Sequence, residues 1–179
     1  MWALASAGVA PIALTAGEII GAAKQPTGYS SVRNSISALA ERGATDRWIM
    51  TAALVILGVC YILTAVGVTD CPSLARWLLA LGGAATVVVA ALPQPSAGHV
   101  PAAAIAFVAL AVWPAVSLLP SRPIAFGVTV LLIGLLLWFG LQLSGGWLGL
   151  TERFLVTAEA LWPLALTLTL FLRRNPAAQ

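Results

Sequence analysis

Long apolar stretches separated by short polar breaks dominate the hydrophobic pattern of this chain. A helix needs about 20 mostly apolar residues to cross the hydrocarbon core of a bilayer. Short breaks that contain Pro or Gly favour antiparallel packing of consecutive helices. The pattern therefore predicts an all-α polytopic membrane protein, a single domain over residues 1–179 with six transmembrane helices in an antiparallel bundle. The predicted spans cover residues 2–23, 48–68, 74–92, 99–119, 124–143 and 151–172.

One long polar segment, residues 24–48, interrupts this pattern between the first two spans. Within it Val32, Ile36 and Leu39 recur at the spacing of one face of an α-helix. A helix with an apolar stripe and a polar opposite side is suited to the membrane interface. We therefore expect an interfacial amphipathic helix over about residues 30–42, lying over the ends of the first, fourth and sixth spans.

Composition supports the membrane assignment and narrows the range of partners. Only 8% of the 179 residues are charged and 60% are hydrophobic, whereas soluble domains carry roughly 25% charged residues. The net charge of +3 comes from a few residues near span ends, so it concerns topology and lipid headgroups and not nucleic acid. The single histidine argues against a multi-histidine metal site and against a haem held by two histidines. We expect no cofactor and no metal.

Alternation of the spans places nearly all of the unusual polar residues on one side of the membrane. An even number of spans puts both termini on the opposite side. Basic residues are divided almost evenly between the two sides and do not decide the orientation, but Arg173 and Arg174 directly after the last span favour cytoplasmic termini. The polar residues that gather on the other side are Glu18, Arg33, Asn34, His99, Gln142, Glu152, Arg153 and Glu159.

Two carboxyl groups are predicted to lie within the spans. Glu18 is roughly 9 Å below the end of the first span and Glu159 roughly 12 Å inside the sixth. Pro163 leaves the carbonyl of Glu159 without its helical hydrogen bond, which would place a kink and a carboxyl together. Such groups either line a polar cavity, with Glu18 paired to Arg33 or Arg153, or form structural bonds between helices. Both interpretations remain open.

The other candidate residues divide in the same way. His99 opens the fourth span and is either an acid–base group or a histidine at a helix start. In the first loop, Arg33, Asn34 and Ser37 offer donors for an anionic headgroup, or form a solvated face. Trp162 precedes Pro163 and lies one turn beyond Glu159. The chain contains no nucleophile motif of a known hydrolase class.

The chain resembles a bacterial family of six-helix integral membrane proteins known as domain-of-unknown-function family 998. The resemblance rests on YSSVRNSISALAERGATDRWIM in the first loop, LPQPSAGH before the fourth span, FVALAVWPA within it and GLTERFLVTAEALWP in the sixth. It implies a location in the bacterial inner (cytoplasmic) membrane but no activity or substrate. The positions that it marks are Asn34, Ser35, Ser37, Asp46, Arg47, His99 and Glu159.

Three functions are compatible with these residues. The first is non-enzymatic binding of a membrane lipid or small amphiphile in a polar cavity that opens to one leaflet, as in a carrier, sensor or accessory subunit. The second is an intramembrane lipid-modifying enzyme that uses His99 with Glu152 or Glu159. The third is a packing subunit of a larger complex, formed with copies of itself or with a partner membrane protein. The predicted ligand-binding residues are Glu18, Arg33, Asn34, Ser37, His99, Glu152, Arg153, Glu159 and Trp162.

Overall fold

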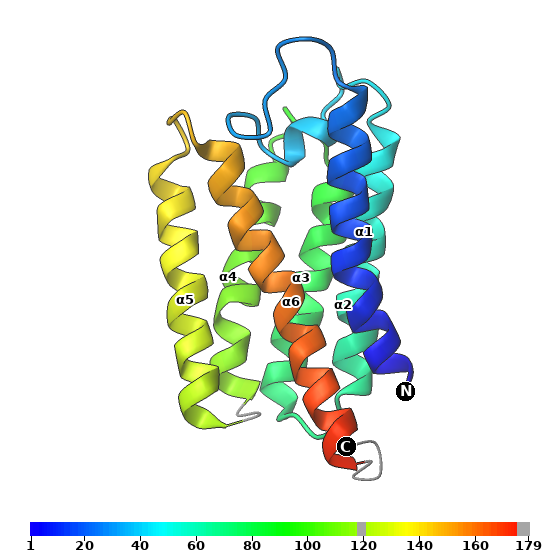
Figure 1. Cartoon of the computed structure of the whole chain (residues 1–179), viewed down its shortest axis with the longest axis vertical. Coiled ribbons are helices and arrows are strands. Elements are labelled where there is room, and N and C mark those ends of the chain that lie inside the picture. The colour runs from blue at the N-terminus through cyan, green and yellow to red at the C-terminus, as the bar shows by residue number, and fades with distance from the viewer. Residues whose placement is uncertain (118–120, 175–179) are drawn as a thin grey trace.

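The computed structural model describes residues 1–117 and 121–174 and consists of six long helices (Figure 1). All six are long and apolar enough to cross a membrane. The prediction of an all-α, six-helix bundle is therefore confirmed. The helices are α1 (Trp2–Lys24), α2 (Trp48–Gly67), α3 (Ser73–Ala91), α4 (His99–Ser117), α5 (Arg122–Leu141) and α6 (Leu148–Arg174).

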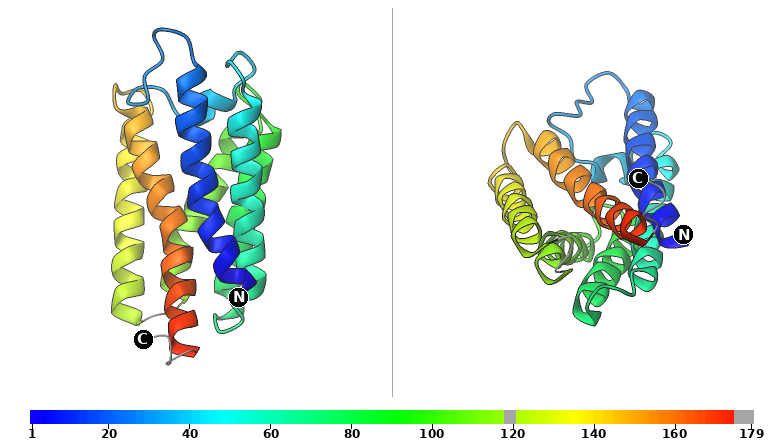
Figure 2. Two further views of the ribbon diagram at one scale, coloured as in Figure 1. Left: turned by 45° about the vertical axis from the view of Figure 1, so that its right-hand side comes forward. Right: turned by 60° about the horizontal axis from the view of Figure 1, so that its bottom comes forward.

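The helices form a closed ring in sequence order. Each helix packs against the next, and α6 returns between α5 and α1 (Figure 2). The start of α1 and the end of α6 lie at one end of the bundle, and the first loop, residues 25–47, lies at the other (Figure 1). The expectation that both chain ends share a side is thus confirmed for the described residues. The predicted end of the fourth span, at 118–119, lies outside them.

Small residues bring the first three helices into close contact. A Cβ atom added at Gly58 in α2 would lie 2.5 Å from the carbonyl oxygen of Gly83 in α3, and one at Gly83 would lie 2.6 Å from that of Gly58. Gly17 in α1 packs in the same way against Ala53 of α2. Glycine at these positions lets the helix backbones approach as closely as they do in tightly packed membrane helices. One side of the ring is therefore firmly packed.

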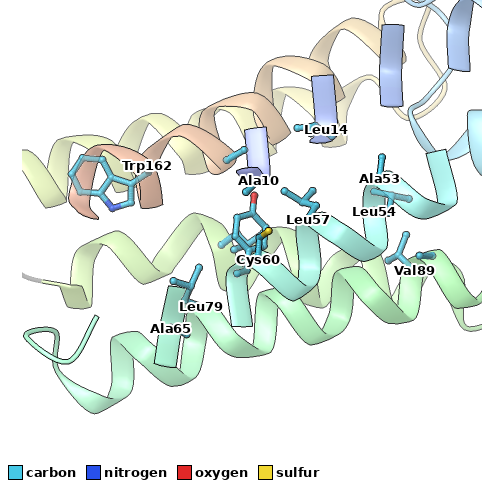
Figure 3. Close-up of a cluster of buried hydrophobic side chains, with 14 of the residues drawn as sticks. Ala10, Leu14, Ala53, Leu54, Leu57, Cys60, Ala65, Leu79, Val89 and Trp162 are labelled. Atoms are coloured by element: carbon cyan, nitrogen blue, oxygen red, sulfur yellow. The ribbon is translucent and has the colours of Figure 1, made fainter. Parts of the chain in front are cut away.

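Apolar side chains fill the space between these helices. Ala10 and Leu14 of α1, Leu57 of α2 and Leu79 of α3 belong to one buried cluster (Figure 3). Large apolar side chains also face outward all around the bundle, as a lipid-facing surface requires. Helix α5 packs against α4 and α6 but differs from the other helices, because few of its residues are buried.

The first loop does not contain the predicted amphipathic helix. Residues 30–34 form turns, and the only helical piece described between 30 and 42 is the 3₁₀ helix η1, Ser37–Ala40. The expected apolar stripe is present in part, but it points into the bundle: Ile36 and Leu39 are buried, and Val32 is exposed. The α-helix is lost because the carbonyl groups of the loop bond to α6 and because Asn34 and Ser35 bond nearby backbone N–H groups.

Candidate functional site

Arg153 joins helix α6 to helix α1 and to the first loop. Its Nε atom lies 3.2 Å from Oε2 of Glu18. Its Nη1 atom donates hydrogen bonds to the carbonyl oxygens of Ser31 (2.7 Å) and Asn34 (2.9 Å), and Nη2 donates to the hydroxyl of Tyr29 (2.8 Å). A guanidinium carries five N–H donors in a fixed plane, and nearly all of them are used here.

The loop lies directly on the beginning of α6. The backbone N–H of Leu150 donates to the carbonyl oxygen of Val32 at 3.0 Å, so the loop satisfies a donor that a helix N-terminus leaves free. A Cβ atom added at Gly149 would overlap the carbonyl oxygen of Asn34 and crowd that of Ser31. Glycine is thus required at this contact.

Glu152 holds the next part of the loop. It is 4% exposed, and its Oε2 atom accepts a hydrogen bond of 2.6 Å from the backbone N–H of Ile36. Arg153 and Glu152 are consecutive residues and therefore point to different sides of α6. One binds the outer part of the loop and the other its buried part. Two adjacent charged residues thereby fix the first loop over the end of the bundle.

His99 is also buried at this end, at the start of α4. Its Nδ1 atom lies 2.7 Å from the carbonyl oxygen of Leu92. A carbonyl can only accept, so Nδ1 donates this hydrogen bond, and in the tautomer that it defines Nε2 is an acceptor. Within the described part of the chain no carboxylate bonds this histidine. The pairing of His99 with Glu152 or Glu159 that acid–base chemistry would need is therefore not formed in this structure.

A cleft of about 780 Å³ opens between α4 and α5. Phe107 of α4 and Phe139 of α5 both line it and contact each other edge to face, with ring centroids 5.4 Å apart. The α4–α5 cleft has an apolar length, formed by the two helices, and a polar end beneath the first loop. The polar residues that line it are Ser35, Ser37, Gln94, His99 and Glu152.

A second, much smaller space lies inside the bundle. This interior cavity of about 50 Å³ is lined by Tyr61, Thr86 and Glu159 among others. Glu159 is 1% exposed, and its Oε1 atom has no hydrogen-bond partner. A cavity of this size with several polar groups has room for water. Ser37, Glu152, Ala103 and Phe107 line both the interior cavity and the α4–α5 cleft, so the two spaces are neighbours.

The remaining predicted residues lie elsewhere. Arg33 is exposed on the loop, and Asn34 accepts a hydrogen bond from the backbone N–H of Ser30. Trp162 is buried on α6, its Nε1 atom has no partner, and it lines neither space (Figure 3). The structure thus groups Ser37, His99 and Glu152 at the cleft, Glu18 with Arg153 at the loop, and Glu159 in the interior.

Three residues of this region were not expected from the sequence. Tyr29 and Gly149 position the loop, and Gln94 lines the polar end of the cleft. Gly149 lies in a stretch that reads as a turn, SGGWLGL, although α6 already begins at Leu148. All three lie within the sequence stretches on which the family resemblance rests, but their chemistry alone did not single them out.

A ring of six apolar helices, with a polar loop fixed over one end and a cleft beneath it, defines a multi-pass α-helical membrane protein. Comparison with protein families agrees with this class. The chain belongs to the family described as "Protein of unknown function (DUF998)", whose model matches residues 7–169. Comparisons with curated proteins and with solved structures gave no significant match.

Proposed function

We propose that this protein binds a membrane lipid or small amphiphile in the α4–α5 cleft and acts as a carrier, sensor or accessory subunit. The observation that supports the proposal is the distribution of the lining residues. They are apolar along the two helices and polar beneath the first loop. A lipid in a leaflet is ordered in the same way, with its chain toward the membrane centre and its head at the surface. The volume of about 780 Å³ lies within the range of about 300–1,000 Å³ that is typical of small-molecule sites.

The weak packing of α5 supports the same function. Most of α5 is exposed, and only Ala125, Thr129 and Leu132 are buried along its length. A lipid chain can enter from the membrane beside such a helix without passing through water. The proposal includes a location in a bacterial cytoplasmic membrane with both termini on the cytoplasmic side, so that the polar end of the cleft faces the outer leaflet.

Two glycines of α5 provide a matched test. Gly140 lines the cleft and Gly134 does not, and a Cβ added at either position has nothing within 4 Å. Gly140→Trp would therefore fill the cleft without a backbone clash, while Gly134→Trp adds the same side chain elsewhere on the helix. Native mass spectrometry of gently extracted protein should show retained lipid for the wild type and for Gly134→Trp, and little for Gly140→Trp.

Equal lipid retention by the two tryptophan variants would contradict the proposal. Loss of an oligomer in Gly140→Trp, with no lipid bound to the wild type, would instead indicate that this face packs against another chain. Size-exclusion chromatography of both variants shows whether each keeps the fold of the wild type.

A further inference from the structure

The polar end of the α4–α5 cleft carries no lysine or arginine side chain among the described residues that line it. Arg153 follows the cleft residue Glu152 in the chain, but its guanidinium is bound to Glu18, the loop carbonyls and Tyr29. Arg33 is exposed and does not line the cleft. A phosphate or carboxylate head is normally held by such cations, above all by the planar fork of arginine. The cleft therefore lacks the partner that an anionic head requires.

The groups that do line this end are acceptors or can serve as acceptors. Since Nδ1 of His99 donates to Leu92, Nε2 is left to accept. Glu152 uses Oε2 for the N–H of Ile36, which leaves its other oxygen. The hydroxyl of Ser37 and the amide of Gln94 can each donate or accept. A site that offers acceptors and a carboxyl group, and no cation, disfavours an anionic head and favours a group that brings its own protons.

From this arrangement we infer that the cleft selects amphiphiles whose head donates hydrogen bonds, a hydroxyl or an ammonium, over those with a phosphate or carboxylate head. The inference rests on the proposed function, because it assigns the polar end of the same cleft. A hydroxyl head would donate to Nε2 of His99. An ammonium head would in addition be attracted by Glu152. The hydroxyl head and the ammonium head both donate hydrogen bonds. Only the binding of the ammonium head depends on a charge on Glu152.

Amphiphiles with one alkyl chain and different heads test the selection. Purified full-length protein in detergent is titrated with the alcohol, the amine, the carboxylate and the phosphate, and bound ligand is measured by native mass spectrometry. We expect the alcohol or the amine to bind about tenfold more tightly than the anionic members of the series, since one or two hydrogen bonds of ordinary strength differ between them.

Two variants identify the head. In His99→Asn the side-chain amide can still donate to Leu92, but no group replaces Nε2, and binding of the alcohol should fall about tenfold. Glu152→Gln keeps an oxygen for Ile36 and removes the charge. It should weaken binding of the amine more than binding of the alcohol. Glu41→Gln, which removes a carboxylate from the first loop outside the cleft, is the matched control.

The outcomes separate this inference from the proposed function. Tighter binding of the phosphate or the carboxylate, or equal binding of every head, with each bound ligand displaced in Gly140→Trp, would overturn the head selection and leave the proposed function intact. No displacement of any bound ligand by Gly140→Trp would overturn both.

Discussion

Replacement of Arg153 by methionine should release the first loop and destabilise the whole bundle. Methionine keeps much of the apolar stem but leaves Glu18 without its ion-pair partner and the Ser31 and Asn34 carbonyls without a donor. Both charged side chains are mostly buried, at 15% and 14% exposure. Removal of one partner from a buried pair costs about 3–5 kcal/mol. Water can reach the loop carbonyls once the loop moves, so we expect the lower value, about 3 kcal/mol.

Two measurements report this change. The free energy of unfolding of the purified protein should fall by about 3 kcal/mol, a change of roughly a hundredfold in the unfolding equilibrium. Arg33 lies in the exposed part of the loop, so the rate of trypsin cleavage after Arg33 should rise in Arg153→Met. Glu18→Gln should have a smaller effect on cleavage, because the bonds from Arg153 to the loop remain.

A double-mutant cycle with Glu18→Gln and Arg153→Met isolates the ion pair. The double variant should be less destabilised than the sum of the single variants, because the neutral amide that replaces the Glu18 carboxylate no longer needs a cation. Arg153→Lys should restore only part of the loss, since an ammonium cannot reproduce the planar fork. If Arg153→Met has the same free energy of unfolding and the same rate of trypsin cleavage as the wild type, the assigned role of Arg153 is incorrect.

Three further predictions follow from the same structure. Gly149→Ala should also speed trypsin cleavage of the first loop, because its Cβ would displace the Asn34 carbonyl, whereas Gly146→Ala, with nothing within 4 Å, should not; equal rates would contradict the close contact. Burial, helped by Asp70 and opposed by Arg76, raises the pKa of the Cys71 thiol from 9.0 to about 11. The rate of its alkylation in a Cys60→Ala background should therefore keep rising between pH 9 and 11, because the thiolate is the reactive form. A rate that levels off near pH 9, as in the unfolded chain, would refute this. Single cysteines placed at Met1 and at Arg33 of a protein without native cysteines should react with an impermeant maleimide from opposite sides of the membrane, and labelling from one side would contradict the topology.

The sequence placed most of the helices correctly to within a few residues. The α6 helix begins at Leu148 and not at Thr151, because Gly149 fits the loop contact and does not end the helix. The segment 30–42 was predicted as a helix from the spacing of its apolar residues alone. That spacing could not show that the loop carbonyls bond to residues more than a hundred positions away.

The sequence identified the unusual polar residues, but it did not identify the residues that they contact. The sequence left Glu18 the choice between Arg33 and Arg153, and the structure pairs it with Arg153. The sequence grouped His99 with Glu159, whereas the structure places them at different spaces, the α4–α5 cleft and the interior cavity. Which carboxyl faces which space depends on the rotation of α6 about its axis, and packing against α1 and α5 sets that rotation.

By itself the sequence determined that this chain forms six membrane helices whose two ends share a side and whose unusual polar residues gather at the opposite side. These features follow from the length of apolar stretches and from alternation, which are local properties. Only the tertiary structure decided that α6 closes the ring, that Arg153 and Glu152 fix the first loop, and that a cleft lies between α4 and α5. These depend on contacts between distant residues, where close packing at glycines draws the first three helices together while α5 stays mostly exposed.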